Sequence, residues 1–381
     1  MDRYKYLKIK AELLAEGIQA SPQALTGVGE VYKEQNHGLF GWDFEDHAQM
    51  LLPDDFVLPD GTTVQFRKNS ASPYKIYLAQ EGLMLGYGEK DICRVEWILR
   101  PKYYSKKTDS NQDMVKIGQI GGQDCLFFCY QNYCSHFAKG RQCLFCNLNS
   151  TFKTYKSVLK KKEIKDIGKV AGEAFSEGMV KHVLLTGGCF SHQKEIELVS
   201  DIVNSIKDYT GFDRIPGTIL PSPPKGEDEI KRYYNTGIGA IGFSMEIWDE
   251  DLYKAICPGK SKSTSHHGFL KSIETAVKIF GEGNVYGVFV MGLETKKTFL
   301  EGVRKVTSLG ANVVPFVWSP NPGSRFEGHR PPVGSWFVDT ILEASDIVKN
   351  SGIPAGDENH CYQCDGNSLL HDALRLQGVR L

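Results

Sequence analysis

The sequence predicts an α/β protein whose main part is a partial (β/α)6 barrel of the TIM type, preceded by a mixed α+β N-terminal extension. Two observations carry this prediction. From residue 125 onward, short apolar runs alternate with stretches of helical periodicity, which is the pattern of parallel β-α units. Cysteine, glycine and acidic residues follow the ends of these apolar runs, at the edge where ligands of such folds bind.

Three regions are expected: an extension over residues 1–120, the barrel over 121–350 and a cysteine-containing tail over 351–381. The extension starts with an amphipathic helix over Tyr4–Glu16 and continues with turn-rich segments, of which Thr63–Phe66 has strand character. Its mixed pattern gives no fold signature and leaves its role open.

The barrel is expected to contain six strands, each followed by a helix. The strands correspond to the apolar runs Cys125–Tyr130, Val180–Leu185, Gly217–Leu220, Ile238–Met245, Val285–Met291 and Val313–Val317. The helices are expected over Lys162–Glu177, Lys194–Asp208, Glu227–Asn235, Ser265–Phe280, Lys297–Leu309 and Ser335–Lys349.

Composition excludes several functional classes. With 45 basic and 46 acidic residues, the formal net charge is −1, which argues against a nucleic-acid partner. No apolar run approaches the ~18 residues needed to cross a membrane, and the charged N-terminus does not resemble a signal peptide. A cytoplasmic location is expected. There the ten cysteines stay reduced, so they serve metal binding, catalysis or packing.

Three cysteines in a short stretch form the strongest motif: Cys134, Cys143 and Cys146. Two thiols separated by two residues can bind one metal centre, and three thiolates on a 4Fe–4S cluster leave one iron with an open position. His136 is a possible fourth ligand, so a zinc site is the alternative. Phe145 favours the cluster, because an aromatic ring there could pack beside an organic cofactor on the open iron.

The cysteine loop, with Phe145, resembles the cluster loop of the radical S-adenosylmethionine (radical SAM) superfamily. Other pieces resemble motifs of that family, in the same order along roughly residues 120–330. They are the glycine pair Gly187-Gly188, Ser244 and Glu246 on the fourth strand, and two segments similar to the biotin-synthase-like branch, Gly287–Glu294 and Val313–Arg325.

The resemblance implies a 4Fe–4S cluster and S-adenosylmethionine as cofactors. The residues implied are Cys134, Cys143 and Cys146 for the cluster, Phe145 near the adenine, Gly187 and Gly188 at the methionine amino group, Ser244 and Glu246 at the ribose, and Glu294 in the same cofactor site. The implied reaction is reductive cleavage of S-adenosylmethionine to a 5′-deoxyadenosyl radical, which abstracts hydrogen from a small-molecule substrate.

Several points stay open within this resemblance. Lyase, methylation, sulfur-insertion and rearrangement reactions all fit, and no catalytic residue is assigned. The family implies oxygen sensitivity and a low-potential electron donor of the flavodoxin or ferredoxin type. The alternative function is a zinc-stabilised α/β binding protein without radical chemistry.

The cysteine loop departs from the family pattern in its spacing of eight residues and then two. The family usually has a shorter first gap, and the extra residues Ser135–Gln142 could form an inserted turn at little cost. Cys129 or Cys125 could replace Cys134 as first ligand, although both lie in an expected strand, where a buried thiol is the ordinary interpretation. Cys189 stands where the glycine motif often carries an acid, which would leave more of the binding to backbone groups.

Two further groups of residues attract attention. Cys361 and Cys364, preceded by His360, are a possible second site for an iron–sulfur cluster or zinc, or a reduced pair without a ligand. Trp318 is expected in the core or in a substrate wall. Arg325, after a Pro-Gly turn, is expected to meet a carboxylate or phosphate of the substrate or to form a surface ion pair.

Overall fold

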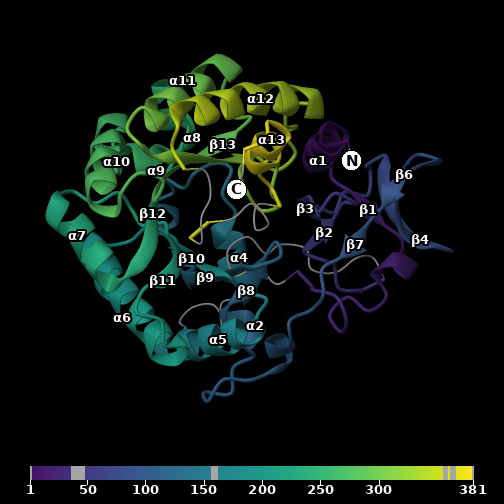
Figure 1. Ribbon diagram of the computed structural model, residues 1–381, viewed down its shortest axis with the longest axis horizontal. Helices are drawn as coiled ribbons and strands as arrows, with labels where there is room; N and C mark the ends of the chain where they lie inside the picture. Colours follow the sequence, from purple (N-terminus) through teal and green to yellow (C-terminus); the bar gives the residue numbers. More distant parts are fainter. Residues whose placement is uncertain (1, 36–47, 156–161, 355–358, 361–365, 380–381) are drawn as a thin grey trace.

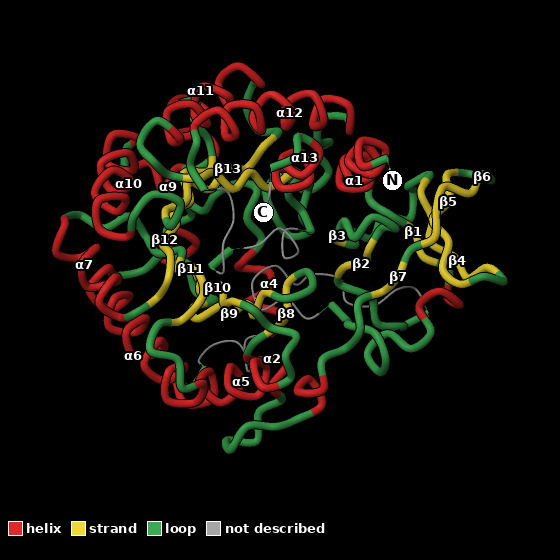
Figure 2. Tube along the Cα trace, viewed as in Figure 1, coloured by secondary structure: helices red, strands yellow, loops and turns green. Residues whose placement is uncertain are grey.

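The computed structural model describes residues 2–35, 48–155, 162–354, 359–360 and 366–379. Its main body is a curled seven-stranded sheet with helices on the outer face (Figures 1 and 2). The strands are β8 (Gln119–Gly121), β9 (Cys125–Gln131), β10 (His182–Gly187), β11 (Ile215–Ile219), β12 (Ile238–Glu246), β13 (Val285–Met291) and β14 (Asn312–Val317).

The strand order is β14-β13-β12-β11-β10-β9-β8. Neighbours from β9 to β14 are parallel, whereas β8 pairs antiparallel with β9 at one edge. Sequential parallel strands joined by helices are the architecture of a partial TIM-type barrel, so the predicted fold class is confirmed. The antiparallel edge strand β8 is an addition that the sequence did not reveal.

The outer layer contains the six helices that follow the parallel strands or lead into them. They are α5 (Ile164–Ser176), α6 (His192–Thr210), α7 (Glu227–Thr236), α10 (His266–Phe280), α11 (Lys296–Thr307) and α12 (Gly334–Ser351). Along β10, Val183 and Leu185 belong to the core beneath these helices. Because strand side chains alternate between faces, His182, Leu184 and Thr186 then face the barrel interior.

Short helices line the carboxyl end of the barrel, where the sequence predicted only loops. They are α3 (Ser135–Ala138) and α4 (Leu148–Tyr155) around the cysteine loop, and α8 (Glu250–Ile256) and α9 (Pro258–Ser263) after β12. Lys162, just before α5, is an exception to the rule that lysines are exposed. Its side chain is buried and its Nζ donates to the carbonyl of Ile117 at 2.9 Å.

The amino-terminal region has its own small core. Its elements are α1 (Arg3–Glu16), β1 (Gln19–Ala20), η1 (Pro22–Leu25), β2 (Asp55–Val57), β3 (Thr63–Gln65), β4 (Tyr74–Ala79), β5 (Gly82–Tyr87), β6 (Lys90–Arg94), β7 (Glu96–Trp97), η2 (Lys102–Ser105) and α2 (Met114–Ile117). The strands form two sheets, β1-β4-β5-β6 and β3-β2-β7. Phe56, Phe66 and Trp97 pack edge to face in the centre of this core.

Both ends of the chain lie against the barrel (Figure 1). Helix α1 packs on α12 and on α13 (Leu370–Leu376), where Lys10 and Asp372 form an ion pair of 2.7 Å. Next to β14, the backbone N–H of Val317 donates to the carbonyl of Asn367 at 2.8 Å. None of the helices in the described ranges has the length and apolar character needed to cross a bilayer.

Candidate active site

The three motif cysteines gather at the carboxyl end of the barrel. Cys134 follows β9 and caps the amino end of α3, while Cys143 and Cys146 lie just before α4. Their thiols are within electrostatic reach of one another: Cys143 and Cys134 both act on Cys146, and together with burial they raise its pKa. Cys125 and Cys129 are instead buried within β9. The structure thus groups Cys134, and neither of the strand cysteines, with the Cys143–Cys146 pair.

Two more thiols belong to this group, and the sequence motif did not reveal either as a neighbour. Cys189 hydrogen-bonds with Cys134, and Cys257 hydrogen-bonds with Cys143. The Cys189 contact and the backbone N–H groups of His136 and Cys189 lower the pKa of the Cys134 thiol well below its usual range. Hydrogen-bond donors that face a sulfur favour its thiolate form, which is the form that binds iron.

Backbone contacts hold the cysteine loop in place from two sides. The N–H of Leu144 donates to the carbonyl of Ile256 at 2.9 Å, and the carbonyl of Leu144 accepts from Phe326 N–H at 3.1 Å. Gly259 at the start of α9 comes so close that a Cβ there would lie 2.4 Å from the carbonyl oxygen of Arg141. The loop between Cys143 and Cys146 is therefore fixed by the segments after β12 and β14.

The glycine pair after β10 lies directly beside the first cysteine. A Cβ on Gly188 would lie 2.4 Å from the carbonyl oxygen of Tyr133 and 2.9 Å from the Cβ of Cys134. A side chain there would displace the Cys134 segment. Gly188 N–H donates to the carbonyl of Gln131 at 2.7 Å, and Ser135 N–H donates to Cys189 at 2.9 Å. Glycine is thus needed here to let two backbone segments approach each other.

Glu246 ends β12 in an unusual backbone conformation, with φ at 70°. Non-glycine residues rarely occupy this left-handed region, and such strain concentrates at functional sites. A register irregularity between Ser244 and Glu246 accompanies it. The Glu246 carboxylate forms an ion pair with Lys260 of α9, whose Nζ also donates to the Ser244 carbonyl at 3.0 Å.

Lys260 is the charged residue at the centre of this site, and the sequence gave no signal for it. Burial lowers the pKa of its ammonium group, but Glu246 and the thiols of Cys143, Cys189 and Cys257 outweigh burial and hold the pKa well above its usual range. The group therefore stays a cation. One positive charge lies among a carboxylate and several thiols, where it offsets the charge of thiolates.

Glu294 and the carboxyl end of β13 support the neighbouring loop. The Glu294 carboxylate accepts from the backbone N–H groups of Trp248 at 2.8 Å and Asp249 at 2.9 Å. Burial raises its pKa, although these two N–H groups partly oppose the shift. Within the described residues Glu294 thus holds the turn that follows Glu246.

The segment after β14 covers the cysteine loop. Trp318 is buried, packs edge to face on Phe326, and its indole Nε1 has no hydrogen-bond partner among the described residues. Asn147 and Ser150, next to Cys146, donate to the carbonyls of Pro322 and Gly323 at 3.2 Å. Phe145 is half-buried and packs on the main core, whereas Arg325 is exposed.

Three cysteine thiols are a donor set that iron–sulfur clusters use. Among the described side chains, no three His, Cys, Asp or Glu residues surround a point that could hold one metal ion. A cluster spaces its thiolate ligands more widely than one ion does, and Cys134, Cys143 and Cys146 approach from two sides with Lys260 nearby as a counter-charge. Cys361 and Cys364 lie outside the described residues.

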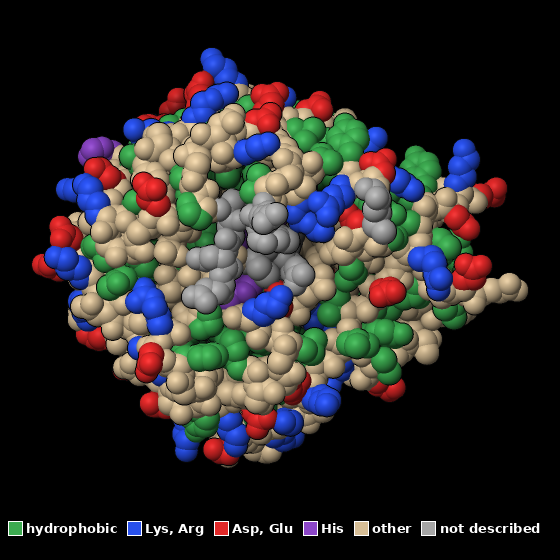
Figure 3. Space-filling model, viewed as in Figure 1, with side chains coloured by type: hydrophobic (Ala, Val, Ile, Leu, Met, Phe, Trp, Pro, Cys, Tyr) green, Lys and Arg blue, Asp and Glu red, His purple; other side chains and the backbone are tan. Residues whose placement is uncertain are grey.

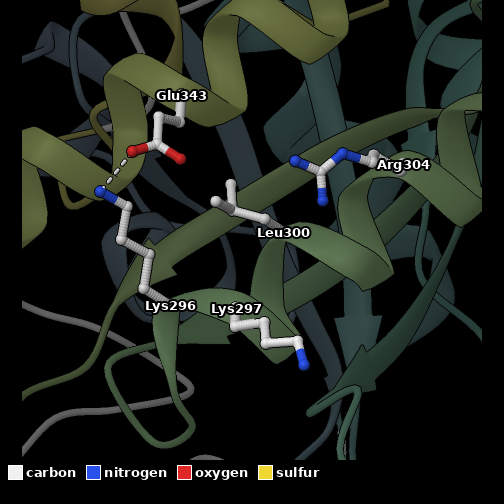
Figure 4. A pocket seen from close by; sticks show the side chains of 5 residues that line it. All are labelled: Lys296, Lys297, Leu300, Arg304 and Glu343. Carbon is white, nitrogen blue, oxygen red and sulfur yellow. Dashed lines mark ion pairs between the residues drawn. The ribbon is translucent and has the colours of Figure 1, made fainter.

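A surface hollow lies away from these thiols, on the outer helices. It has a volume of about 390 Å³ and is lined by Lys296, Lys297, Leu300, Arg304 and Glu343 (Figure 4). Lys296 and Glu343 form an ion pair of 2.5 Å across it. On the face shown in Figure 3, acidic and basic side chains are interspersed, with no continuous patch of one sign.

Comparison with known proteins finds similarity to one family and to several of its relatives. Residues 129–306 match the radical SAM superfamily. The bacteriochlorophyllide c C-7(1)-hydroxylase of Chlorobaculum limnaeum is 27% identical over 254 residues, or 62% of this chain. The match spans 63% of that relative, less than two thirds of its length.

Solved structures also match the chain, with low sequence identity. Methylornithine synthase is 16% identical, with a TM-score of 0.46 over 66% of this chain and 70% of its own. The FeFe-hydrogenase maturase HydG from Carboxydothermus hydrogenoformans is also 16% identical, with a TM-score of 0.46 over 60% of this chain and 51% of its own.

Proposed function

Because the chain carries a radical SAM superfamily domain, we propose that Cys134, Cys143 and Cys146 are the ligands of its 4Fe–4S cluster. The protein is a radical SAM enzyme, and the family implies this cluster and S-adenosylmethionine as cofactors. When bound, they supply a 5′-deoxyadenosyl radical that abstracts hydrogen from a substrate carbon. One observation supports the ligand assignment: Cys134 and Cys143 lie close enough to Cys146 to raise the pKa of its thiol, and the cation of Lys260 lies close to Cys143.

The residues around the thiols suit the polar groups of S-adenosylmethionine. Glu246, held by Lys260, presents a carboxylate that can accept hydrogen bonds from ribose hydroxyls. Lys260 offers ammonium N–H groups to a carboxylate in a partly buried setting, where charge-assisted hydrogen bonds are stronger than neutral ones. Gly187 and Gly188 leave backbone groups open to close approach. Glu294 acts indirectly, because its carboxylate holds the turn that follows Glu246.

The substrate is proposed to be a small organic molecule with a hydrogen-bond acceptor near Trp318. A buried indole N–H without a partner among the described residues is costly, by about 1–3 kcal/mol, and a substrate oxygen would satisfy it. Arg325 is proposed to contact an anionic group at the exposed edge. The named reaction of the Chlorobaculum limnaeum relative makes hydroxylation of a carbon atom the first reaction to test.

We also propose the branch of the family and the electron donor. The biotin-synthase-like branch rests on the Gly287–Glu294 and Val313–Arg325 segments. A flavodoxin or ferredoxin-type donor of low potential is proposed as the electron source. The family match favours the enzyme over a zinc-stabilised binding protein.

The decisive experiment is anaerobic reconstitution with iron and sulfide, followed by incubation with dithionite and S-adenosylmethionine. We expect a brown protein that releases 5′-deoxyadenosine. Deuterium transfer from labelled candidate substrates into 5′-deoxyadenosine would identify the substrate, and replacing dithionite with reduced flavodoxin would test the donor. A colourless, zinc-containing protein that forms no 5′-deoxyadenosine would contradict the proposal.

A further inference from the structure

The amino-terminal region places a guanidinium group at the carboxyl end of the last barrel strand. Arg67 follows β3, and its Nη2 donates to the carbonyl of Val317, the last residue of β14, at 3.1 Å. The N–H of Val317 donates to Asn367 rather than to β13, so its carbonyl points to the same outer edge of the sheet. Strand β14 is an edge strand. Arg67 therefore lies beside the open side of the partial barrel.

The described partners of Arg67 are all neutral oxygens. Its Nε donates to the side-chain carbonyl of Gln65 at 3.2 Å, and its Nη1 donates to the carbonyl of Leu14 at 3.0 Å. A guanidinium carries one N–H on Nε and two on each terminal nitrogen. Within the described residues, one N–H on each terminal nitrogen of Arg67 therefore has no acceptor. Such a pair of N–H groups matches the two oxygens of a carboxylate.

No carboxylate in the described part of the chain balances the charge of Arg67. Burial lowers the pKa of its guanidinium to about 9, and no neighbouring acid opposes this shift. The nearby acids of α1 do not serve: the pKa of Glu12 is raised by burial and by Glu16, without a contribution from Arg67. A charge removed from water is costly unless an opposite charge accompanies it. An anion bound beside Arg67 would be that partner.

Trp318, the next residue after Val317, supplies an independent observation that a ligand belongs here. Val317 belongs to the main core beneath the helices, whereas Val314 and Phe316 belong to a separate cluster inside the barrel. The N–H of Trp318 still donates to Met291 of β13 at 2.9 Å, so the alternation of strand side chains puts Trp318 in the inner row. Trp318 is 6% exposed, and its indole N–H has no acceptor among the described residues. Buried polar groups are nearly always satisfied, so an acceptor is missing inside the barrel.

These donors and the wall between them define one chemical class of ligand. A carboxylate brings one negative charge, which one guanidinium balances, whereas a phosphate monoester brings about −1.5 to −2 at neutral pH. The inner side chains of β14, Val314 and Phe316, are apolar. The ligand that fits is thus an organic acid with an apolar body and a further oxygen that can accept from Trp318.

We propose that Arg67 binds the carboxylate of the substrate, and that the substrate is an organic acid whose apolar body lies along β14 toward Trp318. This inference rests on the proposed function, because it concerns the substrate of the same site. It gives the amino-terminal region a role: this region supplies the charge that selects the substrate, while the barrel supplies the chemistry.

The test measures binding of benzoate and benzamide to the cluster-loaded full chain by isothermal titration calorimetry. Both probes have the same ring, but only benzoate has the charged oxygen pair. The wild type should prefer benzoate roughly 10- to 100-fold. Arg67→Gln should bind both probes equally and weakly, because glutamine carries no charge. The matched control is Arg214→Gln, which should keep the preference: Arg214 also donates to a strand carbonyl, that of Ile238 at 3.1 Å, but at the amino end of β12.

A second variant guards against a folding defect. Arg67→Lys keeps the charge but not the paired N–H groups, so it should retain a preference for benzoate that is roughly 10-fold smaller than that of the wild type. Equal binding of both probes by the wild type, or an unchanged preference in Arg67→Gln, would overturn the proposal. Loss of the preference in Arg325→Gln alone would also overturn it, because the anion would then be held at the exposed edge.

The binding measurement needs no turnover, so it separates this inference from the proposed function. A protein that prefers benzoate through Arg67 but forms no 5′-deoxyadenosine would keep the anion site and reject only the proposed reaction. A protein that forms 5′-deoxyadenosine but binds benzamide as well as benzoate would keep the reaction and reject the role of Arg67.

Discussion

The two ends of the barrel are built from the same six strands but differ in the residues that gather there and in what those residues do. At the carboxyl end, the half-buried Lys260, the carboxylate of Glu246, whose backbone is left-handed, and five thiols lie close together. At the amino end, Asn359 joins the segment that follows α12 to β11, by accepting hydrogen bonds from Gly217 and Thr218. The residues at the carboxyl end form the candidate active site at a cost in folding stability. The contacts at the amino end instead hold the segment after α12 against the sheet. This contrast explains why disrupting each end should have a different readout.

The largest effect is expected at the carboxyl end. Cys146→Ala removes one proposed cluster ligand, and 5′-deoxyadenosine formation should fall by at least ~100-fold. The melting temperature of the apoprotein should change little, because the thiol is only half-buried. Cys93→Ala, a cysteine of the amino-terminal region, is the control and should retain activity. Full turnover by Cys146→Ala would reject the ligand assignment.

A pair of glycine variants separates the two ends by stability. A Cβ on Gly239 would lie 1.7 Å from the Oδ1 of Asn359, which would break the bond from Gly217 at the amino end. We expect Gly239→Ala to lower the free energy of unfolding by about 2–4 kcal/mol. Gly188→Ala should instead act mainly on iron content, because it pushes on Cys134. Denaturant unfolding and iron analysis of both variants test this prediction. If both variants lost the same amount of stability and of iron, the two ends would not differ in the way proposed.

The cation of the carboxyl end should matter for cofactor affinity. Lys260→Met removes the charge that faces Glu246 and the thiols, so KM for S-adenosylmethionine should rise roughly 10- to 100-fold. The control is Lys254→Met, an exposed lysine of α8 whose partners are surface acids. A rise in KM of the same size in both variants would argue against a specific role for Lys260.

The smallest expected effect concerns pH. Glu195 of α6 accepts from the Tyr130 hydroxyl at 3.0 Å and from Ser222 N–H at 3.2 Å, and burial raises its pKa from 4.5 to about 7. Between these values the folded chain keeps a proton that the unfolded chain releases. Stability should therefore fall as pH rises through this window, by about 1–3 kcal/mol. Glu195→Gln cannot ionise, so its unfolding curves at pH 5 and pH 8 should differ less than those of the wild type.

Periodicity was sufficient to predict the framework. The expected strand Val285–Met291 has the same bounds in the structure, and the expected helix Glu227–Asn235 differs from α7 by one residue. All seven residues of Val285–Met291 are buried, and α7 buries one face, so the core sets the apolar pattern of both segments. The thiols and the glycine pair were also recognisable, because few other residue types can do their work.

The parts that sequence reasoning missed depend on contacts between distant segments. Lys260 lies in a short polar helix, and only the fold brings it to Glu246. His266 likewise is buried against Trp248 and Tyr253, two residues that precede it by 18 and 13 positions. Helices as short as α8 and α9 have too few residues to show a helical period in the sequence. Tertiary contacts therefore determine whether they form.

The contact of α1 with α12 and α13 has a consequence for the order of assembly. Helix α1 is made before its partners, and Lys10 pairs with Asp372 of α13, 362 residues later in the chain. A nascent chain that does not yet include α12 and α13 lacks these partners. We therefore expect α1 to remain undocked until both helices have been synthesised.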